Sequence, residues 1–411
     1  MGVHSNQASS IAVEIQIMKI LVIGNRIPWP IKDGGAMASF QLLKGYAEAG
    51  VQVCFVTLNT KKHWLDETAM QEAFPFCETR AIAHDANLHP MKALQNVISS
   101  RSYFLDRYRN AQALRVLEEQ VIGVDWVQVE GLYSMPLAME LKRKFPEIKC
   151  AYRAHNVEYQ IWERLLHSHL PWWKKLYLRI QVARLKREEV QAWNWADALL
   201  PISRDDQVHM RVHAPQVDSC LLLPGVPVQV QRSLPLKLHS VCHLGSMEWM
   251  ANQEGVAWFL REVWPLVLKG NQKAEFHLAG KGMDPNDPRF SGPGVINHGE
   301  VADSSEFLQS HGILVVPLQA GSGIRMKTLE ALSLGVPVVS TPVGAQGLES
   351  ISGEGLEIAE SPTQMASQLL EWMSNAPVAQ AAAEKGAAAV QVKYNLETNV
   401  AQALAFLRQR N

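Results

Sequence analysis

The sequence has few cysteines, no long apolar run and no excess of either charge. Its five cysteines are scattered over 411 residues and never form a CxxC pair, which predicts a reduced, cytoplasmic setting and no structural zinc. No apolar run approaches the roughly 20 residues that a membrane span needs. With 39 basic and 40 acidic residues the net charge is -1, so no overall field would attract nucleic acid or an anionic membrane. Any anion site must be local.

A dinucleotide fingerprint and a signal peptide are also missing. The GxGxxG spacing follows none of the expected strands, which counts against a dehydrogenase. Residues 1–17 have neither the basic start nor the apolar core of a secretory signal. We therefore expect residues 1–17 to be a disordered leader or an artefact of an upstream start.

Strand-like apolar runs alternate with helical patterns in two successive series. The first series begins with KILVIG and the second with SVCHLGS. Such alternation predicts βαβ units and a doubly wound parallel sheet in each of two α/β domains, which suits a chain too long for one ordinary core. We expect domains at 18–223 and 239–392, a linker at 224–238, and a final helix at 393–411 that could pack back on the first domain.

The most informative segment runs from Pro317 to Gly347, after an expected strand of the second series. Gly323 lies in a glycine turn, where a backbone can approach a ligand closely. Arg325 and Lys327 place two cations at the start of a helix whose free N–H groups favour anions. Glu330, one turn later, could accept hydrogen bonds from ribose or sugar hydroxyls. The pattern predicts the diphosphate site of a nucleotide sugar, although a helix with a solvated charged face fits the periodicity equally well.

A second loop, from Gly24 to Gly35, joins the first expected strand to a helix. Asp33, Gly34 and Gly35 form a turn directly before that helix, so its N-terminal amides could face a phosphate or a sugar. In open parallel sheets, ligands bind beyond the carboxyl ends of the strands, and this loop lies at such an end. A plain strand-to-helix turn is an equal alternative.

Four further residues follow expected strands. His155 ends the strand KCAYRAH, and its imidazole could contact a sugar hydroxyl or a phosphate oxygen; a structural histidine is the alternative. Asn156 could contact the donor or bond the backbone of its own loop. Gly245 and Gly280 lie in glycine turns of the second domain that would close on the base and the pyrophosphate.

A basic aromatic helix is expected from Pro171 onward. The segment PWWKKLYLRIQVARLKREEV combines Trp172 and Trp173 with several lysines and arginines. Such a helix could lie on an anionic bilayer. A surface helix whose apolar face packs on its own domain is the alternative.

Four motifs occur in a characteristic order: PWPIKDGGAMAS, RAHNVEYQIWERL, LAGKG and GSGIRMKTLEALSLGVPVVSTPVGAQGL. Through them the chain resembles the GT-B glycosyltransferases, specifically the retaining family-4 (group 1) class, over nearly its whole length from Met18. The resemblance implies two Rossmann-like doubly wound domains facing a central cleft. It also implies a hexosyltransferase that moves a sugar from a UDP- or GDP-linked donor with retention, without a metal or a cofactor.

The resemblance implies roles for single residues. His155 would contact the donor sugar near the reaction centre, and Arg325 and Lys327 would hold the diphosphate. Glu330 is similar to the second glutamate of the family's Glu-seven-residues-Glu signature, which bonds the ribose. The loop at Gly34–Gly35 would lie at the junction of the diphosphate and the acceptor.

The chain departs from the family's pattern at two places. Ser322 stands where the first glutamate of the signature is expected, which implies a changed contact to the donor sugar. Met247 and Glu248 stand where many relatives carry a cation soon after the glycine. Arg325 could compensate for that missing cation.

The resemblance implies a glycan or lipid-linked acceptor in cell-surface polysaccharide synthesis, and a place in the cytoplasm or at the cytoplasmic face of the inner membrane. Two alternatives stay open. A sugar-nucleotide epimerase or hydrolase would need convergent carboxylates, for which the first domain offers Asp33, Glu130 and Glu158. A non-catalytic sugar-nucleotide binding protein is favoured by the missing first glutamate. No feature of the sequence sets the oligomeric state.

Overall fold

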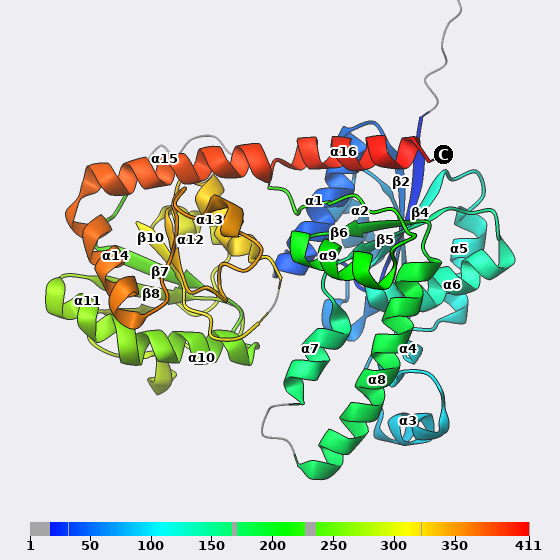
Figure 1. Ribbon diagram of the computed structural model, residues 1–411, viewed down its shortest axis with the longest axis horizontal. Helices are drawn as coiled ribbons and strands as arrows, with labels where there is room; N and C mark the ends of the chain where they lie inside the picture. Colours follow the sequence, from blue (N-terminus) through cyan, green and yellow to red (C-terminus); the bar gives the residue numbers. More distant parts are fainter. Residues whose placement is uncertain (1–16, 32, 167–170, 227–235, 322, 411) are drawn as a thin grey trace, which may run out of the picture.

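The chain forms two six-stranded sheets, each with helices on both faces (Figure 1). The computed structural model describes residues 17–31, 33–166, 171–226, 236–321 and 323–410. Most of the expected leader and of the expected linker therefore lies outside the described residues. The two sheets confirm the prediction of an α/β fold with two doubly wound parallel sheets.

The first sheet has the strand order β3-β2-β1-β4-β5-β6, and every neighbouring pair is parallel. Its strands are β1 (Lys19–Gly24), β2 (Gln52–Thr60), β3 (Glu78–His84), β4 (Trp126–Glu130), β5 (Cys150–Ala154) and β6 (Ala198–Pro201). Its helices are α1 (Gly34–Glu48), α2 (Glu67–Ala73), α3 (Pro90–Gln95), α4 (Tyr103–Asp106), α5 (Ala111–Gln120), α6 (Met135–Lys144), α7 (Glu158–Leu165), α8 (Trp172–Trp195) and α9 (Arg204–His213).

The second sheet has the order β12-β11-β10-β7-β8-β9, again with parallel pairs. Its strands are β7 (Ser240–Leu244), β8 (Glu275–Ala279), β9 (Val295–Asn297), β10 (Ile313–Val316), β11 (Val338–Ser340) and β12 (Leu356–Ile358). The helices that follow β7 are α10 (Met250–Trp258), α11 (Trp264–Gly270), α12 (Ser304–Gln309), α13 (Met326–Ser333), α14 (Pro362–Ser374), α15 (Ala376–Lys393) and α16 (Leu396–Arg408).

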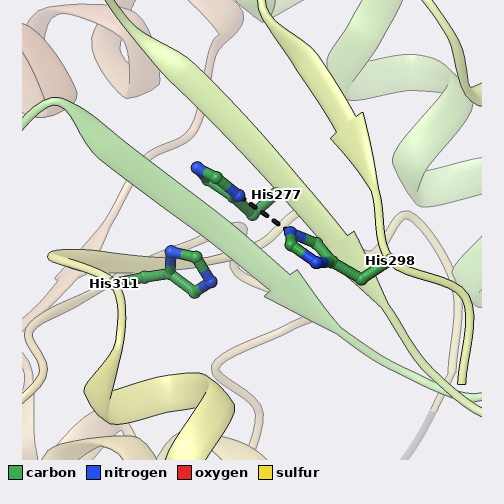
Figure 2. A group of neighbouring side chains, drawn as sticks. All are labelled: His277, His298 and His311. Atoms are coloured by element: carbon green, nitrogen blue, oxygen red, sulfur yellow. Dashed lines mark hydrogen bonds between the residues drawn. The ribbon is translucent and has the colours of Figure 1, made fainter. Parts of the chain in front are cut away.

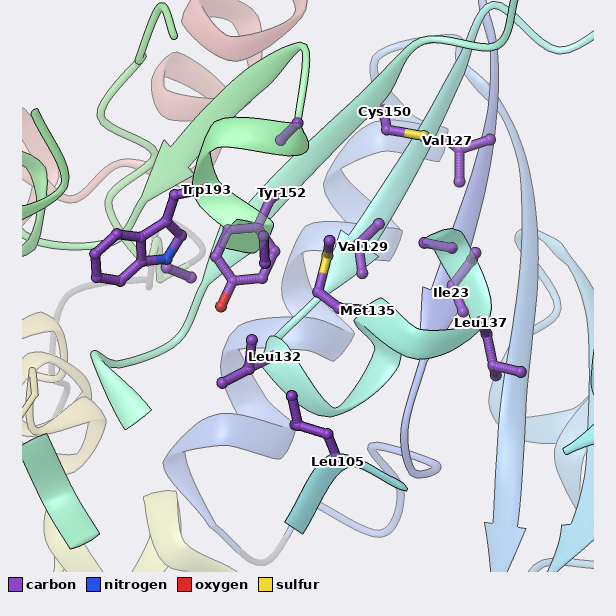
Figure 3. Close-up of a cluster of buried hydrophobic side chains, with 14 of the residues drawn as sticks. Ile23, Leu105, Val127, Val129, Leu132, Met135, Leu137, Cys150, Tyr152 and Trp193 are labelled. Atoms are coloured by element: carbon purple, nitrogen blue, oxygen red, sulfur yellow. The ribbon is translucent and has the colours of Figure 1, made fainter. Parts of the chain in front are cut away.

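Alternate residues of the central strands enter two different apolar clusters. In β1, Ile23 belongs to the cluster drawn in Figure 3, together with Val127, Tyr152 and Trp193. Val22 belongs to a second cluster, which also contains residues of α1. Because helices cover both faces of a parallel sheet, its strands are continuous apolar runs. This burial on both faces is why the sequence pattern locates the central strands.

The sequence pattern does not predict β3 or β12, and both lie at the edge of a sheet. In β3 only Ile82 is buried, while Glu78, Ala81 and Ala83 are exposed. An edge strand has a neighbour on one side only, and charged side chains there protect it from pairing with other chains. β3 and β12 therefore lack the apolar run by which the central strands are recognised, whereas the sequence pattern does predict the edge strands β6 and β9.

The last two helices cross from one domain to the other. Figure 1 shows α15 along the second domain and α16, in red, continuing over the first. A Cβ on Gly45 of α1 would lie 3.0 Å from Val400 Cγ2, and Val400, Ala403 and Leu407 belong to the apolar cluster behind β1. The final helix thus packs on the first domain although it follows the second in the chain.

Candidate active site between the domains

The N-termini of two helices meet where the domains face each other. Helix α1 follows β1 of the first domain, and α13 follows β10 of the second. A Cβ on Gly34 would lie 3.1 Å from Met326 Cγ, so the first turns of α1 and α13 are in contact. Because free N–H groups and the helix dipole make an N-terminus favourable for anions, this junction suits a diphosphate. Gly34 and Gly35 lie in the first turn of α1, and Asp33 is its N-cap, so the two glycines belong to the helix and not to a turn before it as predicted.

The glycine turn before α13 is held against the first domain. Gly321 has φ +137° and Gly323 has φ +80°, conformations that favour glycine. A Cβ on Gly323 would lie 2.9 Å from Asn156 Oδ1, and one on Gly321 would collide with the Arg325 guanidinium. The structure therefore brings Asn156 and Gly323 together across the domains. Ser322, between the two glycines, lies outside the described residues.

Two guanidinium groups lie close together at this turn. Arg164, at the end of α7, donates from Nη1 to the carbonyl oxygen of Gly321 at 2.7 Å. Burial, and then the charge of Arg164, lower the pKa of Arg325. Two cations that repel each other favour an anion between or beside them. Arg325 could be selected from the sequence but Arg164 could not, since nothing in the sequence shows that α7 reaches the second domain.

Glu330 and Lys327 form an ion pair. Lys327 Nζ lies 2.9 Å from Glu330 Oε2, and the hydroxyls of Ser304 and Ser305 donate to Glu330 Oε1 at 2.8 and 2.9 Å. Glu330 is only 5% exposed. Lys327 at Oε2 and the two serine hydroxyls at Oε1 thus fix the orientation of the Glu330 carboxylate. Ser304 and Ser305 begin α12, and sequence reasoning misses them because they are distant from Glu330 in the chain.

His155 belongs to a buried polar network around Glu130. Glu130 Oε2 accepts from Arg153 Nη1 at 2.8 Å, from His155 Nε2 at 2.9 Å and from Ser39 Oγ at 3.0 Å, and Oε1 accepts from Gln128 Nε2 at 2.7 Å. Burial alone would raise the pKa of the Glu130 carboxyl, but Arg153 and His155 hold it well below its usual range. Because an ionised carboxylate only accepts hydrogen bonds, Nε2 of His155 carries the proton. In the neutral ring Nδ1 is then an acceptor.

Two cavities adjoin these residues. One of about 220 Å³ lies between the domains and is lined by Asn156, Arg164 and His209 of the first domain and by Gly323, Ile324 and Gly347 of the second, among others. A smaller cavity of about 40 Å³ is lined by Gly35, Ser39, Glu130 and His155, among others. Of the residues selected from the sequence, Asn156 and Gly323 thus line the larger cavity and Gly35 and His155 line the smaller one, whereas Arg325, Lys327, Glu330, Gly34, Gly245 and Gly280 line neither.

The glycine turns of the second domain pack on each other. Gly280 has φ +154°, and a Cβ there would collide with the carbonyl of Gly245. Beside them, Glu248 accepts from Lys62 of the first domain at 3.2 Å and lies 3.5 Å from Lys281. The hydrogen bond from Lys62 lowers the pKa of Glu248, and the charges of both lysines act in the same direction. Lys62 and Lys281 therefore lie at the position where many relatives carry a cation and this chain has Glu248.

Part of the chain is similar in sequence to known proteins. Residues 239–375 match the family model described as Glycosyl transferases group 1. An uncharacterized 44.6 kDa protein in the cps region of Klebsiella pneumoniae is 24% identical over 380 residues, which cover 87% of this chain and 91% of that protein. The second domain is thus similar to group 1 glycosyl transferases over residues 239–375.

Solved structures share the whole fold. Sucrose-phosphate synthase from Thermosynechococcus elongatus has a TM-score of 0.67 at 15% identity, covering 95% of this chain and 98% of that one. A mutant of S. aureus TarM, in complex with fondaparinux, alpha-GlcNAc-glycerol and UDP, has a TM-score of 0.68 at 13% identity and covers 95% and 100%. Anabaena HepE in complex with UDP-glucose has a TM-score of 0.64 at 12% identity and covers 94% and 99%. The protein therefore has the GT-B fold, as predicted, while the retaining class of the resemblance stays a prediction.

Proposed function

We propose that the protein transfers a sugar from a UDP- or GDP-linked donor to a glycan or lipid-linked acceptor, with retention and without a metal. The meeting of the α1 and α13 N-termini beside Arg325 and Arg164 carries this proposal. As the anomeric bond breaks, negative charge develops on the leaving diphosphate, and preorganised cations and backbone amides stabilise such charge in a dry site. Lys327 and the turn at Gly34–Gly35 complete the proposed diphosphate site.

The remaining residues fit the rest of the donor. His155 Nδ1, as an acceptor, would receive a hydrogen bond from a hydroxyl of the donor sugar, while Glu130 fixes the ring through Nε2. Glu330 would accept from the ribose in exchange for one of its serine partners. For retention, the acceptor would attack the anomeric carbon on the face that the diphosphate leaves. The proton of the acceptor hydroxyl passes to an oxygen of the leaving diphosphate as the new glycosidic bond forms.

The proposed acceptor is a precursor of a surface polysaccharide. The relative from the cps region of Klebsiella pneumoniae supports that role, and S. aureus TarM was solved with a GlcNAc-glycerol, which fits a transferase with a glycan product. The sugar-nucleotide epimerase or hydrolase would need free carboxylates at the cleft. Asp33 is instead in a bidentate pair with Arg26 at 2.6 and 2.7 Å, and Glu158 accepts from Tyr133 at 2.9 Å.

We also propose that the protein acts while bound to an anionic membrane surface. In the described part of the chain, no helix has both the length and the apolar character needed to cross a bilayer. An exposed apolar surface does exist where α3 lies beside the start of α8 (Figure 1), and Tyr177 donates to the Ala93 carbonyl there at 3.4 Å. Its exposed apolar side chains include those of Met91, Leu94, Ile98, Trp172, Trp173 and Leu176.

Cations surround this apolar surface. Lys92, Lys174 and Arg179 are exposed beside it, so the surface combines apolar insertion with attraction to anionic lipids. The buried residues of α8, such as Leu185 and Trp193, lie nearer its C-terminal end. The helix thus packs on its own domain through that end, and exposes tryptophans at the other.

The transferase proposal is tested by incubating the purified protein with a panel of UDP- and GDP-sugars and a membrane extract as acceptor source. We expect nucleotide release and transfer of labelled sugar from one donor. The variant His155→Ala should lower turnover by about 10- to 100-fold with little loss of donor affinity, while His239→Ala, an exposed histidine of the second domain, should match the wild type. An absence of release and binding with every donor would overturn the proposal, and epimerised sugar without transfer would favour the epimerase.

A further inference from the structure

Three histidines of the second domain converge on one place (Figure 2). His277 lies in β8, His298 directly follows β9, and His311 lies between α12 and β10. Their ligand nitrogens all lie within 4.8 Å of one another. His277 and His311 are buried and His298 is exposed. None of the three lines either cavity of the candidate active site.

Neighbouring oxygen atoms determine which nitrogen of each ring faces the shared space. Ser240 Oγ lies 2.6 Å from His311 Nδ1, so Nε2 of that ring is the atom that would bind an ion. Glu275 Oε2 lies 3.3 Å from His277 Nε2, and His277 Nδ1 lies 2.9 Å from His298 Nε2. Histidines that bind metals typically bond through their second nitrogen to a carboxylate, a carbonyl or another oxygen. His277 and His311 therefore each have an outer partner of the kind found at metal sites.

We infer that His277, His298 and His311 bind a divalent transition-metal ion, Zn²⁺ being the best match, through His277 Nδ1, His298 Nε2 and His311 Nε2. Imidazole is a preferred ligand of zinc, copper and nickel. With zinc–nitrogen distances of about 2.0 to 2.1 Å, the nitrogens of a tetrahedral site lie about 3.3 Å apart. His277 Nδ1 and His298 Nε2 are 2.9 Å apart, slightly below that value, and the ligand nitrogens of all three residues lie within 4.8 Å of one another. The exposed side at His298 would admit water as the fourth ligand.

The surroundings suit neutral imidazoles. The Phe307 ring packs edge-on against His311 at 4.6 Å and against His298 at 5.5 Å, measured between ring centroids. Burial lowers the pKa of His277, although Glu275 opposes this, and a neutral ring is the form that binds a metal. Since the ligand His311 follows α12 by two residues, an ion here would tie the end of α12 to β8 and β9. The same helix begins with Ser304 and Ser305, which orient Glu330.

The test uses untagged protein, freed of metal with a chelator and titrated with ZnCl₂ in a calorimeter. We expect one tight Zn²⁺ per chain in the wild type. The affinity should fall by about 100-fold or more in His298→Ala, which removes a ligand, and by about 10-fold in Glu275→Gln, which removes an outer partner. His239→Ala, an exposed histidine close in sequence to Ser240, should bind as the wild type does.

Two further measurements separate loss of the site from loss of the fold. Because His298 and Glu275 are exposed, the metal-free variants should melt with the metal-free wild type. Zn²⁺ should raise the melting temperature of the wild type, raise that of Glu275→Gln less, and leave that of His298→Ala unchanged. Co²⁺ in place of Zn²⁺ should give the visible absorption of a four- or five-coordinate ion, which His298→Ala should lose. Equal Zn²⁺ affinities in the wild type and His298→Ala, or a spectrum of hydrated Co²⁺ in the wild type, would overturn the inference.

Discussion

Gly34 and Met326 lie in contact across the two domains, with only 3.1 Å between the place of a Cβ on Gly34 and Met326 Cγ. A larger side chain at Gly34 should push the N-termini of α1 and α13 apart. We expect Gly34→Leu to lower kcat/KM by about 100-fold, the effect of misplacing reacting groups by about 1 Å. Thermal unfolding should change little, because the contact lies between domains. Gly292→Ala, where a Cβ would only touch Val295, is the control, and wild-type activity in Gly34→Leu would contradict the proposed junction.

Arg325→Ala and Lys327→Ala should each weaken binding of UDP or GDP by about 1.5 to 3 kcal/mol, the usual worth of a hydrogen bond to a charged group. Calorimetric titration of each nucleotide measures this directly. Lys273→Ala removes an exposed lysine of the same domain and should leave the affinity unchanged. If both variants bind the nucleotide like the wild type, the diphosphate lies elsewhere.

Glu130→Gln should lower the free energy of unfolding at about pH 7 by about 3 kcal/mol, because Arg153, only 1% exposed, loses its buried counter-ion. The folded pKa of Glu130 lies well below its reference value of 4.5. The ionised carboxylate therefore contributes its full stability above that pH, and the contribution is lost as the pH falls below it.

The difference between the wild type and Glu130→Gln should thus be constant from neutral pH down to about pH 5, and should shrink on further acidification. Urea unfolding at a series of pH values measures it. Glu119→Gln, at an exposed position on α5, provides the comparison for a surface carboxylate. A difference that grows on acidification would show that Glu130 is not held ionised.

The double variant Trp172→Ser/Trp173→Ser should reduce binding to vesicles that contain anionic lipids. The two side chains are 78% and 55% exposed, so their loss removes apolar insertion without disturbing the core. Flotation with phosphatidylglycerol vesicles measures the bound fraction, and added salt should weaken binding further because Lys92, Lys174 and Arg179 act through screened charges. Trp249→Ser, an exposed tryptophan of the other domain, should bind like the wild type. If neither the double substitution nor added salt changes vesicle binding, this surface does not bind the membrane.

The fold could be predicted from the sequence because burial on both faces leaves a continuous apolar run in each central strand. The edge strands β3 and β12 escaped because partial exposure removes that run. Gly34, His155 and Arg325 could be selected because they follow strands, and parallel strands gather their carboxyl ends on one side of a sheet. Their roles stay predictions.

The remaining contacts of the site could not be predicted because they join residues far apart in the chain. Arg164 reaches the Gly321 carbonyl, and Lys62 reaches Glu248, only after the two domains have come together. His277, His298 and His311 have no motif spacing, since they come from separate strands and loops. A sequence pattern reveals residues that lie on one helix or strand, or at neighbouring strand ends. The interdomain contacts and the three histidines have neither arrangement.

The two passages of the chain between the domains are bonded to each other. Val226 lies within the expected linker at 224–238, and its N–H donates to the carbonyl of Tyr394 at 3.0 Å. A Cβ on the preceding Gly225 would collide with Leu396. In the described residues, the two passages between the domains are thus joined at this point. A change in the contact between Gly225 and Leu396 would therefore alter how the domain that carries Arg325 is held relative to the domain that carries His155, although neither Arg325 nor His155 is near it in the chain.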